Sequence, residues 1–338
     1  MRFIDSLLRR QLYLFMETLN SLFRETIKQV VSLSKSSTFI TEENVYQEGA
    51  EDILPYLDKM VEFVALPGSG LAGLENLEEL LEKAEAGKSC LLLLEHYSNL
   101  DLSLFSYFVR KAGGRGADIG RAVIAIAGMK LSEENPVVAA FAGAYTRIVI
   151  YPSRSLQGLD AVKDRAEIIR SNAINRAAMK TLTDLKSKGR LILLFPSGTR
   201  YRPWDPSTKR GVREIDSYIK SFDYMCFVAI NGEVLHVKPG DMMEDEVTKD
   251  IVRISASPVI SCEEFREKVR AEVDAAQQRL ETDPAELSSE HDILAAPAAA
   301  VDNSPADKKQ AVADAIMVEL ERMHIASEEK RKRILAKP

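Results

Sequence analysis

The chain has 338 residues, of which 46% are hydrophobic, 28% charged and 7% aromatic, an ordinary globular composition with ample apolar material for a core. The formal net charge of -6 argues against a general nucleic-acid-binding protein. Cys90, Cys226 and Cys262 lie far apart and form no CxxC pair, so neither a zinc site nor a disulfide framework is indicated, and a reducing, cytoplasmic compartment fits.

The N-terminal region is predicted to be helical. Apolar residues recur at three- and four-residue steps over residues 3–33, which predicts a long amphipathic helix. Packing on the main domain is favoured over an interfacial helix on anionic lipid, because Glu17 and Glu25 lie among its basic residues. Residues 42–64 and 74–86 also favour helices, so residues 1–85 are expected to form a helical N-terminal region.

No membrane span or secretory signal is predicted. The first five residues begin no long apolar segment with a cleavage site, and no stretch approaches the ~20 apolar residues that a spanning helix needs. Any membrane contact would be peripheral, and we expect a cytoplasmic protein that at most touches the inner membrane at its surface.

From residue 88 onwards, short apolar runs alternate with helical stretches. Strands are predicted at 90–95, 121–127, 147–151, 190–195, 225–230 and 251–257. Helices are predicted at 99–112, 134–144, 158–188, 212–221 and 262–281. This alternation predicts a layered α/β domain with a mixed sheet over residues 86–281.

The C-terminal part is predicted to be a linker followed by a helix. Residues 282–306 are rich in Pro, Ala, Ser and Asp, which is typical of a linker. Residues 307–335 form a charged helical pattern within a C-terminal segment of residues 307–338. Its basic end, Lys330-Arg331-Lys332-Arg333, is expected to be solvated and favoured by the helix dipole, and the alternative is a contact with lipid or a partner.

A histidine and an aspartate follow the first predicted strand of the α/β domain, in the run Leu91-Leu92-Leu93-Leu94-Glu95-His96-Tyr97-Ser98-Asn99-Leu100-Asp101. Five residues of α-helix turn by about 500°, so the two side chains meet only if His96 precedes the helix and folds back on its first turn. Asp101 would then hold one imidazole nitrogen and leave the other as a base. The alternative is that Asp101 only caps the helix; a metal site is disfavoured because no third ligand lies nearby.

A basic loop follows the predicted strand 190–195. Pro196-Ser197-Gly198-Thr199 must turn at the carboxyl end of this strand, where ligands bind in open α/β sheets. Residues 196–213 hold five basic residues against one acidic residue, a net charge of +4. We expect a positive field suited to an anionic substrate, with arginines matching phosphate oxygens. The alternative is a solvated basic loop.

Two further residues bear on the same edge of the sheet. Strand 147–151 would deliver Arg154 there, although a surface arginine at the start of a loop is the alternative. Ser197 could be a hydrolase nucleophile, but the nucleophile elbow needs Gly-x-Ser-x-Gly, and Phe195 stands at the first glycine position.

The two clusters together resemble a known family. His96–Asp101 resembles the H-x4-D block of the glycerolipid acyltransferases, and Phe195–Arg200 resembles their F-P-E-G-T-R block, with Ser197 where most members carry Glu. The soluble glycerol-3-phosphate acyltransferases of plastids also carry Ser there, followed by a second Arg and a Pro-Asp-Pro-Ser-Thr run. This chain continues with Arg200-Tyr201-Arg202-Pro203-Trp204-Asp205-Pro206-Ser207-Thr208, with one inserted Trp. The resemblance spans roughly residues 85–260.

The resemblance implies roles for the site residues. His96 and Asp101 would be the catalytic pair, and Arg154, Arg200 and Arg202 would bind the phosphate of the acceptor. Arg154 stands where the plastid block has a lysine, and Ser155 stands where it has a histidine. The family's fold is an α/β domain with a helical N-terminal domain.

The expected reaction is transfer of a fatty acyl group from an acyl carrier protein or coenzyme A thioester to the sn-1 hydroxyl of glycerol 3-phosphate. The product would be lysophosphatidate, in the first step of phospholipid synthesis. Backbone N–H groups of Ser197 and Gly198 would hold the oxyanion, and no cofactor or metal is required. The alternatives are a lysophosphatidate acyltransferase, a serine hydrolase and a catalytically silent lipid-binding protein on the same fold.

Overall fold

The computed structural model describes residues 17–35, 37, 39–129, 135–156, 158–240, 242–282 and 307–336. The first part of the predicted N-terminal helix, residues 3–16, and nearly all of the predicted linker lie outside these residues. The N-terminal region contains α2 (Leu19–Leu33), β1 (Tyr46–Gln47), the 3-10 turn η2 (Glu51–Ile53), α3 (Leu54–Val64), β2 (Gly70–Ala72) and α4 (Leu74–Glu85).

The rest of the chain alternates strands and helices. The first half contains β3 (Cys90–Leu94), α5 (Asp101–Lys111), α6 (Gly116–Ala122), β4 (Val123–Gly128), α8 (Pro136–Ala142), β5 (Arg147–Ile150), η3 (Ser153–Leu156), α9 (Arg165–Leu185) and β6 (Leu191–Leu194). The second half contains η4 (Pro206–Lys209), α10 (Ile215–Ser221), β7 (Tyr224–Asn231), β8 (Leu235–His236), η5 (Met242–Glu244), β9 (Glu246–Val247), β10 (Arg253–Ala256), β11 (Ile260–Ser261), α11 (Cys262–Thr282) and α13 (Lys308–Leu335).

Within the described residues, nine strands form one mixed sheet, in the order β1-β5-β4-β6-β3-β7-β10-β2 with β11 beside β7. The strands from β5 to β7 run parallel to one another, whereas β1 is antiparallel to β5 and β10 is antiparallel to β7 but parallel to β2. The predicted α/β class with a mixed sheet is therefore confirmed. Since β3 and β6 are parallel neighbours with Leu93 opposite Leu194, the loops that follow them lie side by side.

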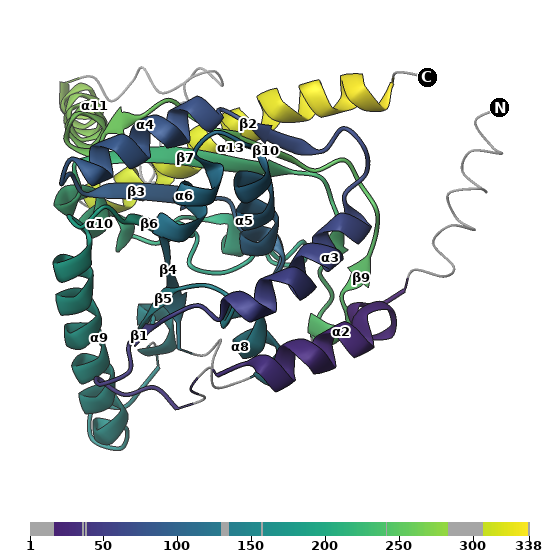
Figure 1. Ribbon diagram of the computed structural model, residues 1–338. Helices are drawn as coiled ribbons and strands as arrows, with labels where there is room; N and C mark the ends of the chain where they lie inside the picture. The colour runs from purple at the N-terminus through teal and green to yellow at the C-terminus, as the bar shows by residue number, and fades with distance from the viewer. Residues whose placement is uncertain are drawn as a thin grey trace.

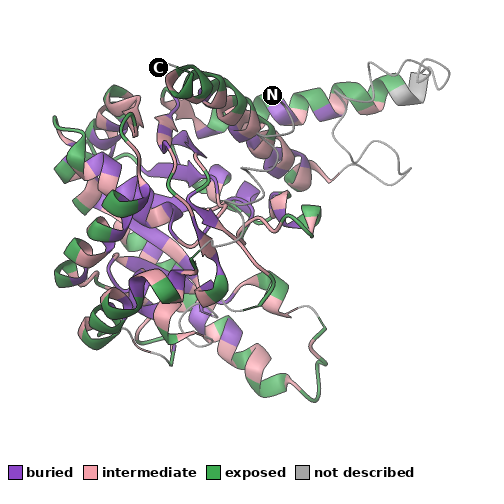
Figure 2. Ribbon diagram, turned by 90° about the vertical axis from the view of Figure 1, so that its right-hand side faces the viewer, coloured by how far each residue is buried: buried purple, intermediate pink, exposed green. Residues whose placement is uncertain are grey.

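The sheet divides the core into two apolar layers, because successive side chains of a strand point to opposite faces. On β3, Cys90, Leu92 and Leu94 face a layer built mainly with α2–α6 and α8. Leu91 and Leu93 face the other layer, which contains side chains of α9, α10, α11 and α13. Figure 1 shows α4 on the near side of the sheet, and Figure 2 shows buried strands between helices whose outer faces are exposed.

The C-terminal helix α13 is part of this core. It packs on β7 and against α10 and α11, and Val312, Ala313 and Ile316 on its inner face are fully buried. Our expectation of a solvated basic end is wrong for Arg331, which is 16% exposed and forms ion pairs with Asp250 and Glu328. The prediction was based only on the composition of the helix end, which does not indicate these acidic partners.

The short elements differ most from the sequence prediction. Residues 42–64 were expected to be one helix, but only residues 54–64 form α3, and Tyr46–Gln47 form an edge strand paired with β5. The predicted strand 121–127 begins at Val123, because α6 continues to Ala122. Strands of two or three residues are too short to show the alternation on which the prediction depends. Within the described residues, no helix has the length and apolar character to cross a membrane.

Candidate active site

His96 and Asp101 meet where β3 passes into α5. Asp101 begins the helix, and its Oδ2 lies 2.9 Å from His96 Nδ1. The same oxygen accepts the backbone N–H groups of Tyr97 at 2.6 Å and Ser98 at 2.8 Å, and the Ser98 hydroxyl donates to Oδ1. The predicted contact is therefore present, and Asp101 also anchors the turn, so the catalytic-pair and capping interpretations are compatible.

This arrangement leaves one imidazole nitrogen for chemistry. Because Nδ1 of His96 is held by a carboxylate that is only 2% exposed, the tautomer with a proton on Nδ1 is favoured and Nε2 remains as a base. The imidazole also stacks on Phe195 from the neighbouring strand end, with ring centroids 4.0 Å apart and planes 23° apart. A buried carboxylate and an aromatic ring thus fix the orientation of the histidine.

The loop after β6 folds directly against the histidine loop. Gly198 adopts a φ of +65°, a left-handed conformation that favours glycine, and its N–H donates to the Phe195 carbonyl at 2.9 Å. The chain then returns so that the Tyr201 N–H donates to the carbonyl oxygen of His96 at 2.8 Å. The backbone of Arg200 and Arg202, the neighbours of Tyr201, is thereby brought to the histidine loop.

The two expected oxyanion donors are placed differently. The turn hydrogen bond to Phe195 already occupies the Gly198 N–H, so the structure gives no support to Gly198 as an oxyanion donor. Ser197 is buried, lines the pocket beside His96, and donates its hydroxyl to the Thr199 carbonyl at 2.7 Å. That hydroxyl is therefore directed to the backbone rather than to a base, which also counts against Ser197 as a nucleophile.

The basic loop is largely neutralised by acidic residues from distant parts of the chain. Arg200 pairs at 2.8 Å with Asp245, which is fully buried. Three more loop cations pair with carboxylates at the start of α13 or on it: Lys209 with Glu321 at 2.5 Å, Arg210 with Asp314 at 3.4 Å, and Arg213 with Asp307 at 3.0 Å. The expected positive field is therefore largely compensated, because four of the five cations have a carboxylate partner.

Arg154 lies at the expected edge of the sheet but further from the histidine. It is exposed on η3, which follows β5, and β4 separates β5 from β6 in the sheet. Arg202 is partly buried, and its backbone N–H donates to the Thr208 hydroxyl at 2.9 Å. The structure thus brings Arg200 and Arg202 to the loop beside His96, whereas Arg154 follows β5, which lies three strands from β3 in the sheet.

A pocket of about 350 Å³ opens beside His96 between the loop after β6 and α13. Its lining combines cations, aromatic rings and aliphatic side chains: Glu95, His96, Tyr97, Ser197, Tyr201, Thr208, Lys209, Arg210, Gly211, Asp314, Met317, Val318 and Glu321. The loop and the helix are in close contact, because a Cβ added to Gly211 would lie 2.8 Å from the Ala313 carbonyl oxygen. The wall formed by α13 was not expected from the sequence.

Glu95 and His324 are further polar residues that the sequence interpretation missed. Glu95 is 4% exposed and accepts hydrogen bonds from the Ile230 N–H at 2.8 Å, the Tyr97 hydroxyl at 3.1 Å and His324 Nδ1 at 3.0 Å. Burial raises the pKa of Glu95, although these donors oppose the shift. Burial lowers the pKa of His324, but the hydrogen bond and charge of Glu95 outweigh it and leave that pKa raised.

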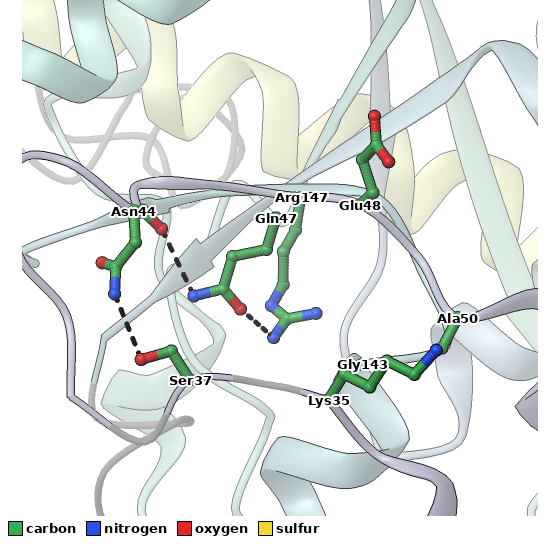
Figure 3. Close-up of a pocket in the computed structure, with 8 residues that line it drawn as sticks. All are labelled: Lys35, Ser37, Asn44, Gln47, Glu48, Ala50, Gly143 and Arg147. Carbon is green, nitrogen blue, oxygen red and sulfur yellow. Dashed lines mark hydrogen bonds between the residues drawn. The ribbon is translucent and has the colours of Figure 1, made fainter.

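A second cavity of about 190 Å³ lies away from this site, between β1 and the start of β5. Figure 3 shows the Gln47 and Arg147 side chains joined there by a hydrogen bond. Arg147 is 2% exposed, and burial lowers its pKa to about 10. Because Arg147 begins β5, this cavity lies at the amino edge of the parallel strands, opposite to the edge that carries His96.

Comparison with known proteins identifies a family and shows a distant likeness to a solved structure. The model of a family described as Acyltransferase matches residues 72–242. No curated protein matches the chain. The chain is also similar to the crystal structure of the 1-acyl-sn-glycerophosphate (LPA) acyltransferase PlsC from Thermotoga maritima, with 14% identity, a TM-score of 0.37, and coverage of 95% of this chain and 88% of that chain. This likeness is too distant to bear on the substrate.

Proposed function

The chain belongs to the acyltransferase family, and we propose that it transfers a fatty acyl group from a thioester to the hydroxyl of a glycerol phosphate ester. The observation that carries the proposal is the contact of 2.9 Å between His96 Nδ1 and the buried Asp101 carboxylate. This contact leaves Nε2 available as a base where the loops after β3 and β6 meet. Removal of a proton from a hydroxyl is the step for which such a pair is suited.

The proposed reaction begins with proton transfer. Nε2 of His96 takes the proton of the acceptor hydroxyl while the hydroxyl oxygen attacks the carbonyl carbon of the thioester. Asp101 stabilises the imidazolium that forms, because its negative charge lies against the protonated ring. The tetrahedral intermediate carries its charge on the former carbonyl oxygen. We assign the stabilisation of this charge to the backbone N–H of the buried Ser197.

Collapse of the intermediate completes the transfer. The carbon–sulfur bond breaks, the new carbon–oxygen bond remains, and the leaving thiolate takes the proton from the His96 imidazolium. The histidine returns to its neutral form, so the proposed cycle needs no covalent intermediate on the enzyme. Both the acyl carrier protein and coenzyme A supply such a thioester, and either is compatible with this proposal.

The pocket beside His96 supports an acceptor with a phosphate and an acyl chain. Lys209 and Arg210 supply cations at this pocket, whereas Met317 and Val318 supply aliphatic surface. Lysophosphatidate has both parts, so we propose it as the acceptor. Glycerol 3-phosphate is the second candidate, because Ser197 and the run Arg200–Thr208 resemble the plastid-type enzymes that acylate it. Arg200 and Arg202 do not line this pocket, and Arg200 already pairs with Asp245, so their proposed contact with the phosphate rests on the resemblance alone.

The proposed division of labour follows the chain. Residues 86–281 would carry the chemistry. The helical region 1–85 precedes them, and the linker 282–306 connects them to the C-terminal segment 307–338. Arg154 would guide the anionic acceptor along the sheet edge from its exposed position.

His96→Ala tests the proposed base. In an assay with purified protein, the variant should lose acyl transfer by about 10³-fold, within the range usual for a general base. Binding of the phosphate ester should remain close to wild type. His236→Ala is the matched control, because His236 pairs with Glu233 in a short strand outside the pocket. Turnover of His96→Ala within a few fold of wild type would exclude the base assignment.

A crossed assay identifies the substrates. Lysophosphatidate and glycerol 3-phosphate are each tested with acyl carrier protein and coenzyme A thioesters. Faster turnover of lysophosphatidate supports the proposed acceptor, and faster turnover of glycerol 3-phosphate replaces it. If neither acceptor is acylated while the protein binds lipid, a silent lipid-binding protein becomes the better description.

A further inference from the structure

The segment that completes the active site comes from α13, which lies beyond the matched family region of residues 72–242. We propose that His324 of α13 is a positioning residue for the catalytic loop, and that it acts on His96 through the buried carboxylate of Glu95. The proposal deepens the function given above and rests on it for the identity of the base. It assigns to the C-terminal helix a direct part in holding the reacting groups.

Glu95 is placed to control both sides of the histidine. It directly precedes His96, and its backbone N–H continues the sheet by donating to the Val228 carbonyl at 3.1 Å. Its side chain accepts the hydroxyl of Tyr97, the residue that directly follows His96, at 3.1 Å. One carboxylate therefore ties the residues before and after the proposed base to the end of β7.

His324 is the donor to Glu95 that comes from outside the loop and the sheet. Its Nδ1 lies 3.0 Å from Glu95 Oε2, the oxygen that also accepts the Ile230 N–H. The His324 ring lies 5.3 Å from the Tyr97 ring, and Tyr97 in turn lies edge-on to Tyr201 at 6.1 Å. The three rings connect α13 with both loops that form the pocket.

The backbone of α13 is fixed at the same point. Asn231 is 1% exposed at the end of β7 and donates its amide to the His324 carbonyl at 2.9 Å. One turn later, the Ser327 hydroxyl lies 3.0 Å from that of Ser255 on β10. The Asn231 bond thus holds the backbone of His324 itself, whereas the Ser327 bond docks the next turn of α13 to β10.

The chemistry of Glu95 explains why a donor is needed. A carboxylate that is 4% exposed has lost most of its hydration, so its charge depends on the hydrogen bonds that reach it. Without His324, Oε2 would keep the Ile230 N–H but lose a donor that can carry positive charge. The carboxylate would then protonate or turn toward water, and the residues on both sides of His96 would be released.

Four substitutions separate a positioning role from general support of the helix. His324→Ala removes the ring, and His324→Leu keeps apolar volume without a donor. His324→Asn keeps an N–H near the place of Nδ1. Ser327→Ala is the matched control, because it weakens the docking of α13 to β10 without touching Glu95.

The expected result is a loss in kcat. His324→Ala and His324→Leu should lower kcat by about tenfold to a hundredfold with the KM of the acceptor within about twofold, since displacement of a reacting group by 1 Å is costly. His324→Asn should restore kcat to within a few fold of wild type, and Ser327→Ala should retain wild-type kcat. Wild-type kcat in His324→Leu, or equal losses in Ser327→Ala and His324→Leu, would overturn the proposal.

A measurement without substrate keeps this inference distinct from the proposed function. The Tyr201 N–H donates to the His96 carbonyl, so its hydrogen exchange reports whether the catalytic loop is held. Exchange at Tyr201 should accelerate by on the order of tenfold in His324→Leu and remain unchanged in Ser327→Ala. If the wild-type protein fails to transfer acyl groups, the proposed function is wrong, but accelerated exchange at Tyr201 in His324→Leu still supports the positioning role. Unchanged exchange at Tyr201 in His324→Leu refutes the positioning role.

Discussion

The loop after β3 and the loop after β6 lie side by side, but they are held by different kinds of interaction. In the first, Asp101 receives His96, two backbone N–H groups and one hydroxyl from residues at most five positions away. In the second, the cations pair with Asp245 and with acidic residues between 307 and 321. One loop is organised locally and the other by partners distant in the sequence.

This difference affects what each loop can do. A locally bonded turn keeps its geometry whenever β3 and α5 form, which suits a proton-transfer pair that must not move. A loop held by ion pairs with exposed or partly exposed side chains can exchange partners, since such pairs contribute little stability. An anionic acceptor could therefore replace Asp314 or Glu321 as the partner of Arg210 or Lys209 at a small cost.

Among the substitutions that compare the two loops, Asp101→Asn should have the largest effect, because it removes the charge of the local turn while keeping an oxygen for the Tyr97 and Ser98 N–H groups. We expect kcat for acyl transfer to fall by about 10²-fold or more, since the imidazolium loses its counter-charge. Activity and thermal unfolding are measured together. A kcat within a few fold of wild type in a folded variant would show that the local turn is structural only.

The combined change Asp314→Asn and Glu321→Gln should have a moderate effect, on the loop that is held from a distance. Freed from their α13 partners, Arg210 and Lys209 should lower the KM of an anionic acceptor severalfold at low salt. The free energy of unfolding should change by less than about 1 kcal/mol per pair. KM is measured at two ionic strengths.

A matched variant tests whether this effect belongs to the loop. Glu319→Gln removes a carboxylate from the same helix, but one that pairs with Arg322 rather than with the basic loop. It should leave the KM unchanged at both ionic strengths. An equal decrease in both variants would mean that net charge, not release of the loop, attracts the acceptor.

Glu328→Gln should have the smallest effect and tests the docking of α13 by its dependence on pH. The hydrogen bond from Arg331 holds the pKa of Glu328 below its ordinary value of 4.5. A lowered pKa in the folded state stabilises the fold above pH 4.5, and this contribution is lost as the pH falls through the folded pKa. Wild type should exceed the variant by about 1 kcal/mol or less near neutral pH.

Urea unfolding of both proteins at a series of pH values measures this difference. The gap between them should narrow as the pH falls below 4.5, the ordinary pKa of the group. A gap that stays constant or widens in acid would mean that Glu328 acts without its charge.

The local features of the site could be predicted from the sequence. The contact between His96 and Asp101 follows from a strand that ends at Leu94 and a helix that begins at Asp101, and the parallel β3 and β6 follow from their apolar runs. The resemblance to the acyltransferases rests on the two segments that follow these strands. In each case the decisive interactions join residues close in sequence or strands with a clear pattern.

The long-range features could not be predicted in this way. The pairing of Lys209 with Glu321 and of Arg200 with Asp245 depends on how α13 and the segment after β8 pack, which no local spacing encodes. For the same reason no local pattern identifies His324 as a site residue, since its partner Glu95 lies 229 positions earlier in the chain. The available signal in the sequence was Glu95, which directly precedes the histidine at the end of the strand. Only the structure shows that this carboxylate is buried and therefore needs a donor.

The close contact between Gly211 and Ala313 has a consequence for the order in which the protein is made. During translation the N-terminal parts of a chain emerge first, at about 5–20 residues per second, so β3, β6 and their loops leave the ribosome seconds before α13. Until α13 arrives, the pocket lacks one wall and Lys209, Arg210 and Arg213 lack their carboxylate partners. The nascent chain thus carries the proposed base before it carries the surface that confines a substrate, which links full activity to the synthesis of α13.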